Sequence, residues 1–115
     1  MAELDVKERQ AGDVTILDLS GAVRIGEGSV ALRDSIRKFA DAGKNRVLLN
    51  LAGVKYMDSS GVGELIANYT TIRRQGGQLK LLNLTDRIQN ILVITKLLTV
   101  FDSFENEAEA LKSFQ

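Results

Sequence analysis

Two neighbouring hydroxyl groups, those of Ser59 and Ser60, are the groups of this chain best suited to chemistry. They stand in the run Asp58-Ser59-Ser60-Gly61, which joins a short apolar segment to an amphipathic one. Asp and Ser are favoured residues at the start of a helix, so the run predicts a helix N-terminus. Helix N-termini attract phosphate, because their N–H groups are unpaired and the helix dipole is positive there. The run therefore predicts either a site that carries phosphate or a simple helix cap.

The absence of cysteine and histidine limits the reactions that Ser59 could perform. The chain has no thiolate nucleophile, no disulfide and no imidazole that could act as a general base. Lys55 is the only nearby residue that could replace the base of a serine hydrolase. Accepting a phosphate asks less of the protein, since a visiting kinase brings ATP, metal and base. We therefore expect a phosphate acceptor with no catalytic activity, no cofactor and no metal site.

A phosphate on Ser59 would add a charge of about −1.5 to −2 at neutral pH. The N–H groups of the predicted helix would tolerate this charge, whereas Asp58 and an acidic or apolar partner surface would oppose it. We expect phosphorylation to leave the fold intact and to break a complex.

A second segment, residues 26–31, fits a loose dinucleotide-binding pattern of two glycines and a small residue before a helix. No acidic residue follows about twenty positions later, where a ribose ligand is needed, and Asn50 ends the next strand instead. We expect a flexible loop that ends in a helix cap and that is available to contact a partner.

Length and charge narrow the class of protein. The chain has 115 residues, and its 15 basic and 15 acidic side chains give a formal charge of zero. This length suits one compact domain, which we assign to residues 1–115. The balanced charge argues against a nucleic-acid partner. The sequence shows neither an export signal nor a membrane-spanning run, so we expect a cytoplasmic protein.

Alternating strand and helix patterns predict an α/β fold in which helices cover a sheet. Leu4 and Val6 line an opening strand, and residues 14–19 form the next one. The Gly-Asp pair between these strands predicts an antiparallel hairpin. Ser29 is the predicted cap of a first helix, which ends before Gly43.

Residues 46–51 lack polar alternation, so they predict a central strand with both faces covered. A second helix follows Asp58 and ends at Gly76, and residues 78–82 predict a strand parallel to the central one. The apolar stripe of this helix comprises Val62, Leu65, Ile66, Tyr69 and Ile72. Its polar positions, which should face water, are Glu64, Asn68, Arg73 and Arg74.

The C-terminal third predicts a third helix over residues 85–98, a short strand at residues 100–101 and a last helix that begins at Asp102 or Ser103. The residues of the last helix expected to point inward are Phe104, Ala108 and Leu111. The third helix carries more apolar surface than one stripe requires, at Val93, Ile94 and Leu97. This surface suits a partner, and equally a terminal helix or a second copy of the chain.

Taken together, these segments resemble the anti-sigma-factor antagonists, small proteins built on the STAS domain. The resemblance covers nearly the whole chain and is strongest over residues 47–101. It rests on residues 47–51, residues 56–63, the Gly-Gly pair before a leucine-rich strand, and residues 91–97. The resemblance implies a single α/β domain with a mixed sheet of four or five strands and about four helices, mainly on one side.

In that family the unphosphorylated antagonist binds an anti-sigma factor, which is a serine kinase with an ATP site of the GHKL type, and so frees a sigma factor. The kinase phosphorylates the first serine of the motif, which is Ser59 here, and a metal-dependent serine phosphatase restores the active form. The resemblance implies that Ser60 is the neighbouring hydroxyl and Asp58 the preceding acid. It also implies that Gly61 and Gly63 permit close backbone approach. The sequence leaves open whether the protein forms a homodimer.

The chain departs from the family pattern after Gly21, where many members have a Glu, an apolar residue and an Asp. Arg24 stands here in place of that Asp, and the loop is longer. Glu27 is a candidate replacement for the missing acid. We expect the loops after Gly21 and Met57 to form the docking surface. The predicted partner-binding residues are Arg24, Glu27, Asp58, Ser60 and Gly61.

Two other classes of function remain open. A constitutive STAS scaffold, or a transport-associated regulatory module, would use the same fold for fixed contacts without phosphorylation. A neighbouring lipid-transport operon would favour that class. A small nucleotide-binding or hydrolytic enzyme is the third class, and ATP turnover by the purified chain alone would favour it.

Overall fold

The structure is a computed structural model that describes residues 3–115. Its five strands form one mixed sheet in the order β1-β2-β3-β4-β5, in which β1 is antiparallel to β2 and the other neighbours are parallel. The strands are β1 (Leu4–Ala11), β2 (Val14–Val23), β3 (Arg46–Met57), β4 (Gln78–Leu82) and β5 (Ser103–Phe104). The helices are α1 (Glu27–Asp41), α2 (Ser59–Arg74), α3 (Asp86–Ile94) and α4 (Glu107–Lys112). The predicted α/β class, opening hairpin and parallel central strands are confirmed.

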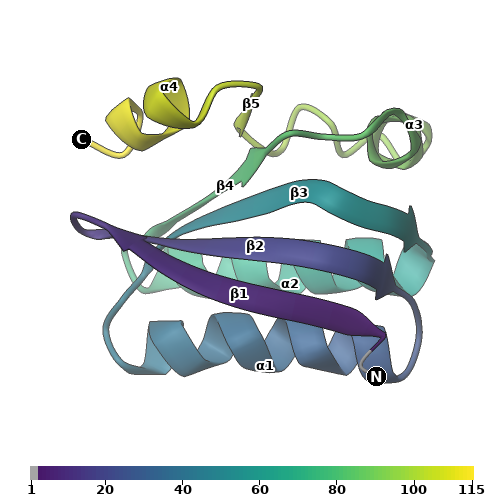
Figure 1. The fold of residues 1–115 in the computed structure, drawn as a ribbon, viewed down its shortest axis with the longest axis horizontal. Helices are drawn as coiled ribbons and strands as arrows, with labels where there is room; N and C mark the ends of the chain where they lie inside the picture. Colours follow the sequence, from purple (N-terminus) through teal and green to yellow (C-terminus); the bar gives the residue numbers. More distant parts are fainter. Residues whose placement is uncertain (1–2) are drawn as a thin grey trace.

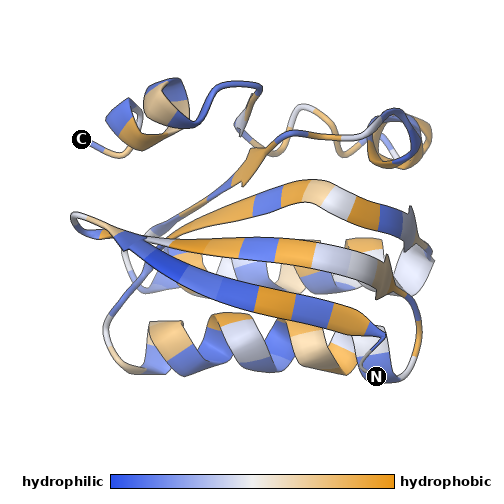
Figure 2. Ribbon diagram, in the orientation of Figure 1, coloured by the Kyte–Doolittle hydropathy of each residue, from blue (hydrophilic) through white to orange (hydrophobic). Residues whose placement is uncertain are grey.

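Helices α1 and α2 cover one face of the sheet, and α4 lies over the opposite face (Figure 1). In β3, Val47 and Leu49 point into the larger core under α1 and α2, while Leu48 points into the smaller core with Phe114. Both faces of β3 are therefore buried over residues 47–49, which explains why these residues are all apolar. Figure 2 shows long hydrophobic stretches in β2 and β3, whereas the edge strand β1 is hydrophilic towards its C-terminal end.

Two elements near the site differ from their predicted bounds. Strand β3 continues beyond residue 51 to Met57, because its second half pairs with the end of β2 after two register shifts. Helix α1 begins at Glu27, with Gly26 in the N-cap position at a φ of 100°. Ser29 therefore lies inside the helix rather than at its cap, and its hydroxyl donates to a backbone carbonyl of the preceding loop at 2.8 Å.

The polar side of α2 also differs from the prediction, because α1 packs beside it. Asn68, expected to face water, is only 2% exposed, and its side-chain amide donates to the Glu64 carbonyl oxygen at 2.7 Å. Glu64 is itself half-buried and accepts a hydrogen bond from Arg33 of α1 at 3.4 Å. The apolar stripe of α2 is confirmed, with Val62 and Leu65 among its buried residues.

Helix α3 ends at Ile94, earlier than the predicted Leu98. Lys96 adopts a left-handed conformation with a φ of 61°, and the Leu97 N–H donates to the Leu92 carbonyl at 2.8 Å. This hydrogen bond spans five residues and closes the helix in a Schellman-type turn, although no glycine is present. The chain then turns back towards the sheet instead of extending the helix.

The predicted strand at residues 100–101 is wrong, and so is the predicted start of the last helix. The strand is β5, which pairs with β4: the Asp102 carbonyl accepts from the Leu81 N–H, and the Phe104 carbonyl accepts from the N–H of Asn83, just after β4. Helix α4 begins later, after Asn106, whose side chain accepts the N–H of residue 109 at 3.0 Å. Ala108 is exposed, which contradicts its predicted inward position. Phe104 and Leu111 pack against the smaller core as predicted, together with the buried Ala110.

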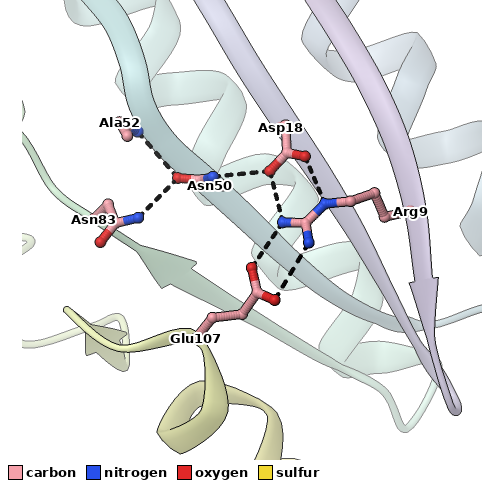
Figure 3. Close-up of polar contacts among 6 residues, drawn as sticks. All are labelled: Arg9, Asp18, Asn50, Ala52, Asn83 and Glu107. Carbon is pink, nitrogen blue, oxygen red and sulfur yellow. Dashed lines mark hydrogen bonds and ion pairs between the residues drawn. The ribbon is translucent and has the colours of Figure 1, made fainter.

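A polar network fastens α4 to the sheet (Figure 3). The Arg9 guanidinium donates to Asp18 at 2.6 Å and to Glu107 of α4 at 2.7 Å. Asn50 of β3 donates to the Asp18 carboxylate at 2.8 Å and accepts from Asn83 at 3.2 Å. The network thus joins β1, β2, β3 and the first turn of α4.

This network predicts a dependence of stability on pH. The hydrogen bond from Arg9 lowers the pKa of Asp18 below its usual value in the folded state. The resulting stabilisation is present above the unfolded pKa of about 3.9 and is lost as the pH falls through the folded value. Asp18→Asn should therefore lower the free energy of unfolding by about 1 kcal/mol at pH 7, and by less near pH 2.

Urea denaturation at the two pH values measures this effect. Asp13→Asn is the matched control, because the Asp13 carboxylate is 90% exposed and lies 3.8 Å from Arg46. The control should change stability by less than about 0.5 kcal/mol at either pH. An equal loss at both pH values for Asp18→Asn would show that the charge of Asp18 contributes nothing.

Candidate functional site

The candidate site lies where β2 and β3 end and where α1 and α2 begin, all at the same end of the sheet (Figure 1). Asp58 is the N-cap of α2, and its Oδ1 accepts the Gly61 N–H at 3.1 Å. Its Oδ2 accepts the N–H of Ile25 at 3.1 Å. One carboxylate therefore begins the helix and also holds the loop between β2 and α1 in place.

Hydrogen bonding keeps Asp58 ionised. Partial burial of the carboxylate would raise its pKa, but backbone N–H groups, first that of Ile25 and then that of Gly61, lower the pKa below its usual value. The side chain is thus an anion at neutral pH, and its charge is directed at backbone amides.

The two serines have different surroundings. Ser59 is the first residue of α2 and is exposed, and within residues 3–115 its hydroxyl has no hydrogen-bond partner. Ser60 is half-buried, and its Oγ lies 3.1 Å from the Oγ of Ser29 in α1. Since the Ser29 hydroxyl donates to the Arg24 carbonyl oxygen at 2.8 Å, the Ser60 hydroxyl is left to donate to Ser29. Of these two serines, Ser59 is the one that presents a free hydroxyl to a visiting enzyme.

Gly61 lies where the backbone of α2 meets the end of β2. A Cβ atom at this position would stand 2.5 Å from the Val23 carbonyl oxygen and 2.7 Å from the Met57 Cγ. Close backbone approach, implied for both glycines of the motif, is present at Gly61. It is absent at Gly63, where a Cβ would have no atom within 4 Å. Of the two glycines, only Gly61 therefore lets the first turn of α2 approach β2 closely.

The two predicted loop residues are tied to the start of β1. The Arg24 Nε donates to the Glu3 carboxylate at 3.2 Å. A carboxylate oxygen of Glu27 accepts the Glu3 N–H at 3.0 Å. Glu27 thus contacts Glu3, just before β1, rather than the serine-containing turn, so its proposed replacement of the missing acid has no support in these contacts.

Exposed apolar side chains surround the site, and no pattern in the sequence predicted their exposure. Ile25 is 79% exposed next to its hydrogen bond with Asp58, and Tyr56 is 40% exposed at the end of β3. Val30, one residue beyond the Ser29–Ser60 contact, is 41% exposed. A strand pattern alone gave no sign of this exposure, because Tyr56 still pairs with Ala22 of β2, whereas the pairing of β3 with β4 stops at Asn50.

A separate apolar patch lies on α3. Val93 and Ile94 are 51% and 79% exposed, as the surplus of apolar residues predicted. Leu97 was expected to join them but is half-buried against the larger core, because the Schellman-type turn redirects the chain.

The cap at Asp58 yields a stability prediction. Asp58→Ala should lower the free energy of unfolding by about 1 kcal/mol, because the N–H groups of Gly61 and Ile25 lose their acceptor. Asp58→Asn should cost clearly less, since its amide oxygen retains one acceptor position in the same place. Urea denaturation of both variants measures the difference, and equal losses would contradict the assignment of Asp58 as a cap.

Within residues 3–115, no helix is both long and apolar enough to cross a membrane. The same part of the chain assembles no group of three or more His, Cys, Asp or Glu side chains that could hold a metal ion.

The α/β architecture with this serine-containing turn defines a STAS domain. The model of that family matches residues 5–110, and the chain belongs to the family. It is 31% identical to the anti-sigma-B factor antagonist of Bacillus subtilis strain 168 over 99 residues. The matched region covers 86% of this chain and 87% of that protein. The chain is thus a member of the anti-sigma-factor antagonists.

Solved structures share the fold. An anti-sigma factor antagonist from Mycobacterium paratuberculosis has a TM-score of 0.85 at 16% identity, over 96% of this chain and 93% of that one. The Bacillus cell fate determinant SpoIIAA in its phosphorylated form has a TM-score of 0.75 at 18% identity, over 96% of this chain and 100% of that one.

Proposed function

We propose that this chain is an antagonist that binds an anti-sigma serine kinase of the GHKL type while Ser59 is unphosphorylated, and so frees a sigma factor. Phosphate on Ser59 switches the binding off, and a serine phosphatase restores it. The observation that carries the proposal is the exposed, unpartnered hydroxyl of Ser59 at the first position of α2. Membership of the antagonist family and the existence of a phosphorylated form of SpoIIAA support it.

The arrangement around Ser59 supports a switch that acts on the complex rather than on the fold. The carboxylate of Asp58 already occupies the amides of Ile25 and Gly61. A phosphate on the neighbouring side chain therefore remains at the surface, where it meets the partner. We propose that the chain is a substrate and not itself an enzyme, since no described side chain is hydrogen-bonded to the Ser59 hydroxyl as a base would be.

Phosphate mapping tests the proposal. The purified chain is incubated with ATP and an anti-sigma kinase that is encoded beside it or retained by it in a pull-down. Mass spectrometry should find phosphate on Ser59 in the wild type and in Ser60→Ala, and no phosphate in Ser59→Ala. Phosphate on Ser60, or on neither serine, would overturn the assignment of Ser59. Absence of phosphate from both serines, together with constitutive partner binding, would favour the alternative function as a constitutive STAS scaffold.

A further inference from the structure

Two guanidinium groups flank the exposed tyrosine beside the candidate site. The Arg24 guanidinium carbon lies 5.5 Å from the centre of the Tyr56 ring, and that of Arg87 lies 5.8 Å from it. We call these three residues the arginine–tyrosine cluster. They come from the loop after β2, the end of β3 and the first turn of α3, which meet at the end of the sheet where α2 begins (Figure 1).

The hydrogen-bonding capacity of this cluster is largely unused. Arg24 donates through its Nε to Glu3, which leaves both terminal amino groups without a partner among residues 3–115. Arg87 has neither an ion pair nor a hydrogen bond to any side chain or carbonyl within the same residues. Each guanidinium presents a planar fork whose geometry matches a carboxylate. Cation–π contact with the Tyr56 ring holds both guanidinium groups beside the same side chain.

Within residues 3–115, Glu3 is the one carboxylate that pairs with the cluster, through the Nε of Arg24. Asp58 accepts from the backbone amides of Ile25 and Gly61. Glu27 accepts from the backbone of Glu3, and only the Glu3 carboxylate pairs with a member of the cluster. The terminal amino groups of Arg24 and the guanidinium of Arg87 are therefore available donors, whereas the carboxylates of Asp58 and Glu27 are directed at backbone amides.

We infer that the arginine–tyrosine cluster, with Ile25 beside it, docks an acidic and partly apolar surface of the anti-sigma kinase. The inference rests on the proposed function, because it describes the partner of that same site. Carboxylates of the kinase take the free forks of Arg24 and Arg87, and its apolar groups cover Ile25 and Tyr56, which are 79% and 40% exposed. A phosphate added to Ser59 repels those carboxylates, which explains why the partner leaves.

Charge substitution tests the inference, with binding to the purified kinase and ADP measured by calorimetry. Arg87→Glu and Arg24→Gln should each weaken binding by about tenfold or more, since removing one partner of an interfacial charge pair commonly lowers the affinity by at least that factor. Glutamate is favourable in the first turn of α3, so Arg87→Glu should keep its fold. The matched control is Arg74→Glu, at the other end of α2, which is exposed and changes the net charge equally.

The outcomes separate this inference from the proposed function. Binding within about twofold of the wild type for Arg87→Glu and Arg24→Gln would overturn the acidic partner surface, and the proposed function would stand if phosphate on Ser59 still abolished binding. Equal losses for Arg87→Glu and Arg74→Glu would also overturn it, because they would report only long-range charge. A wild-type chain that binds no anti-sigma kinase would overturn both.

Discussion

Ser59→Asp should lower the affinity for the anti-sigma kinase by about 100-fold, because it places an unpaired charge in the contact. Ser59 is exposed at the start of α2, and the neighbouring amides of Gly61 and Ile25 are already bound to Asp58. These two amides are therefore not free for the new carboxylate, which lies at the surface and faces the docked protein. Calorimetry with the purified kinase and ADP measures the change in dissociation constant.

Two matched variants complete this experiment. Ser59→Ala removes the hydroxyl without adding charge. This variant should bind the kinase like the wild type, but it cannot be phosphorylated at position 59. Ser60→Ala should also bind and remain a substrate, since the Ser60 hydroxyl is engaged with Ser29. If Ser59→Asp bound as tightly as Ser59→Ala, charge at this position would not control the complex.

Gly61→Ala should lower the free energy of unfolding by about 1–3 kcal/mol, the range for overpacking a close contact. The added Cβ would stand 2.5 Å from the Val23 carbonyl oxygen, which belongs to the backbone of β2 and has little freedom to move. The start of α2 must then shift away from β2. Because Ser59 and Asp58 lie in this turn, we also expect weaker binding of the kinase.

Gly63→Ala is the control for this substitution, and its expected effect has the opposite sign. A Cβ at Gly63 meets no atom within 4 Å, and the residue is exposed in the interior of α2. Replacing a helical glycine with alanine there should stabilise the fold by about 0.5–1 kcal/mol. Urea denaturation compares the two variants, and a loss at Gly63 equal to that at Gly61 would contradict the packing described here.

The elements with strong local signals were predictable from the sequence. Unbroken apolar sequence identified β3 as a central strand, and the spacing of Val62, Leu65 and Ile72 identified α2. The start of α2 at Ser59 follows from local cap chemistry at Asp58, whose side-chain acceptor lies within three residues of its donor. Such short-range preferences are present in the sequence before the chain folds.

The remaining features depend on contacts between distant segments. Asn68 is buried because α1 packs beside α2, and Ser60 is engaged because Ser29, far away in the sequence, lies next to it. The end of α3 depends on a left-handed Lys96, which a non-glycine residue adopts only when its surroundings compensate the cost. The surface formed by Arg24 and Arg87 likewise exists only once three separate segments meet.

The most direct test of the switch compares one protein in two chemical states. Wild-type chain is phosphorylated to completion on Ser59, and its affinity for the kinase and ADP is measured by calorimetry beside that of the unphosphorylated chain and of a phosphatase-treated sample. We predict tight binding for the unphosphorylated and treated samples and loss of about 100-fold or more in affinity for the phosphorylated one. Equal affinity of all three samples would contradict the account.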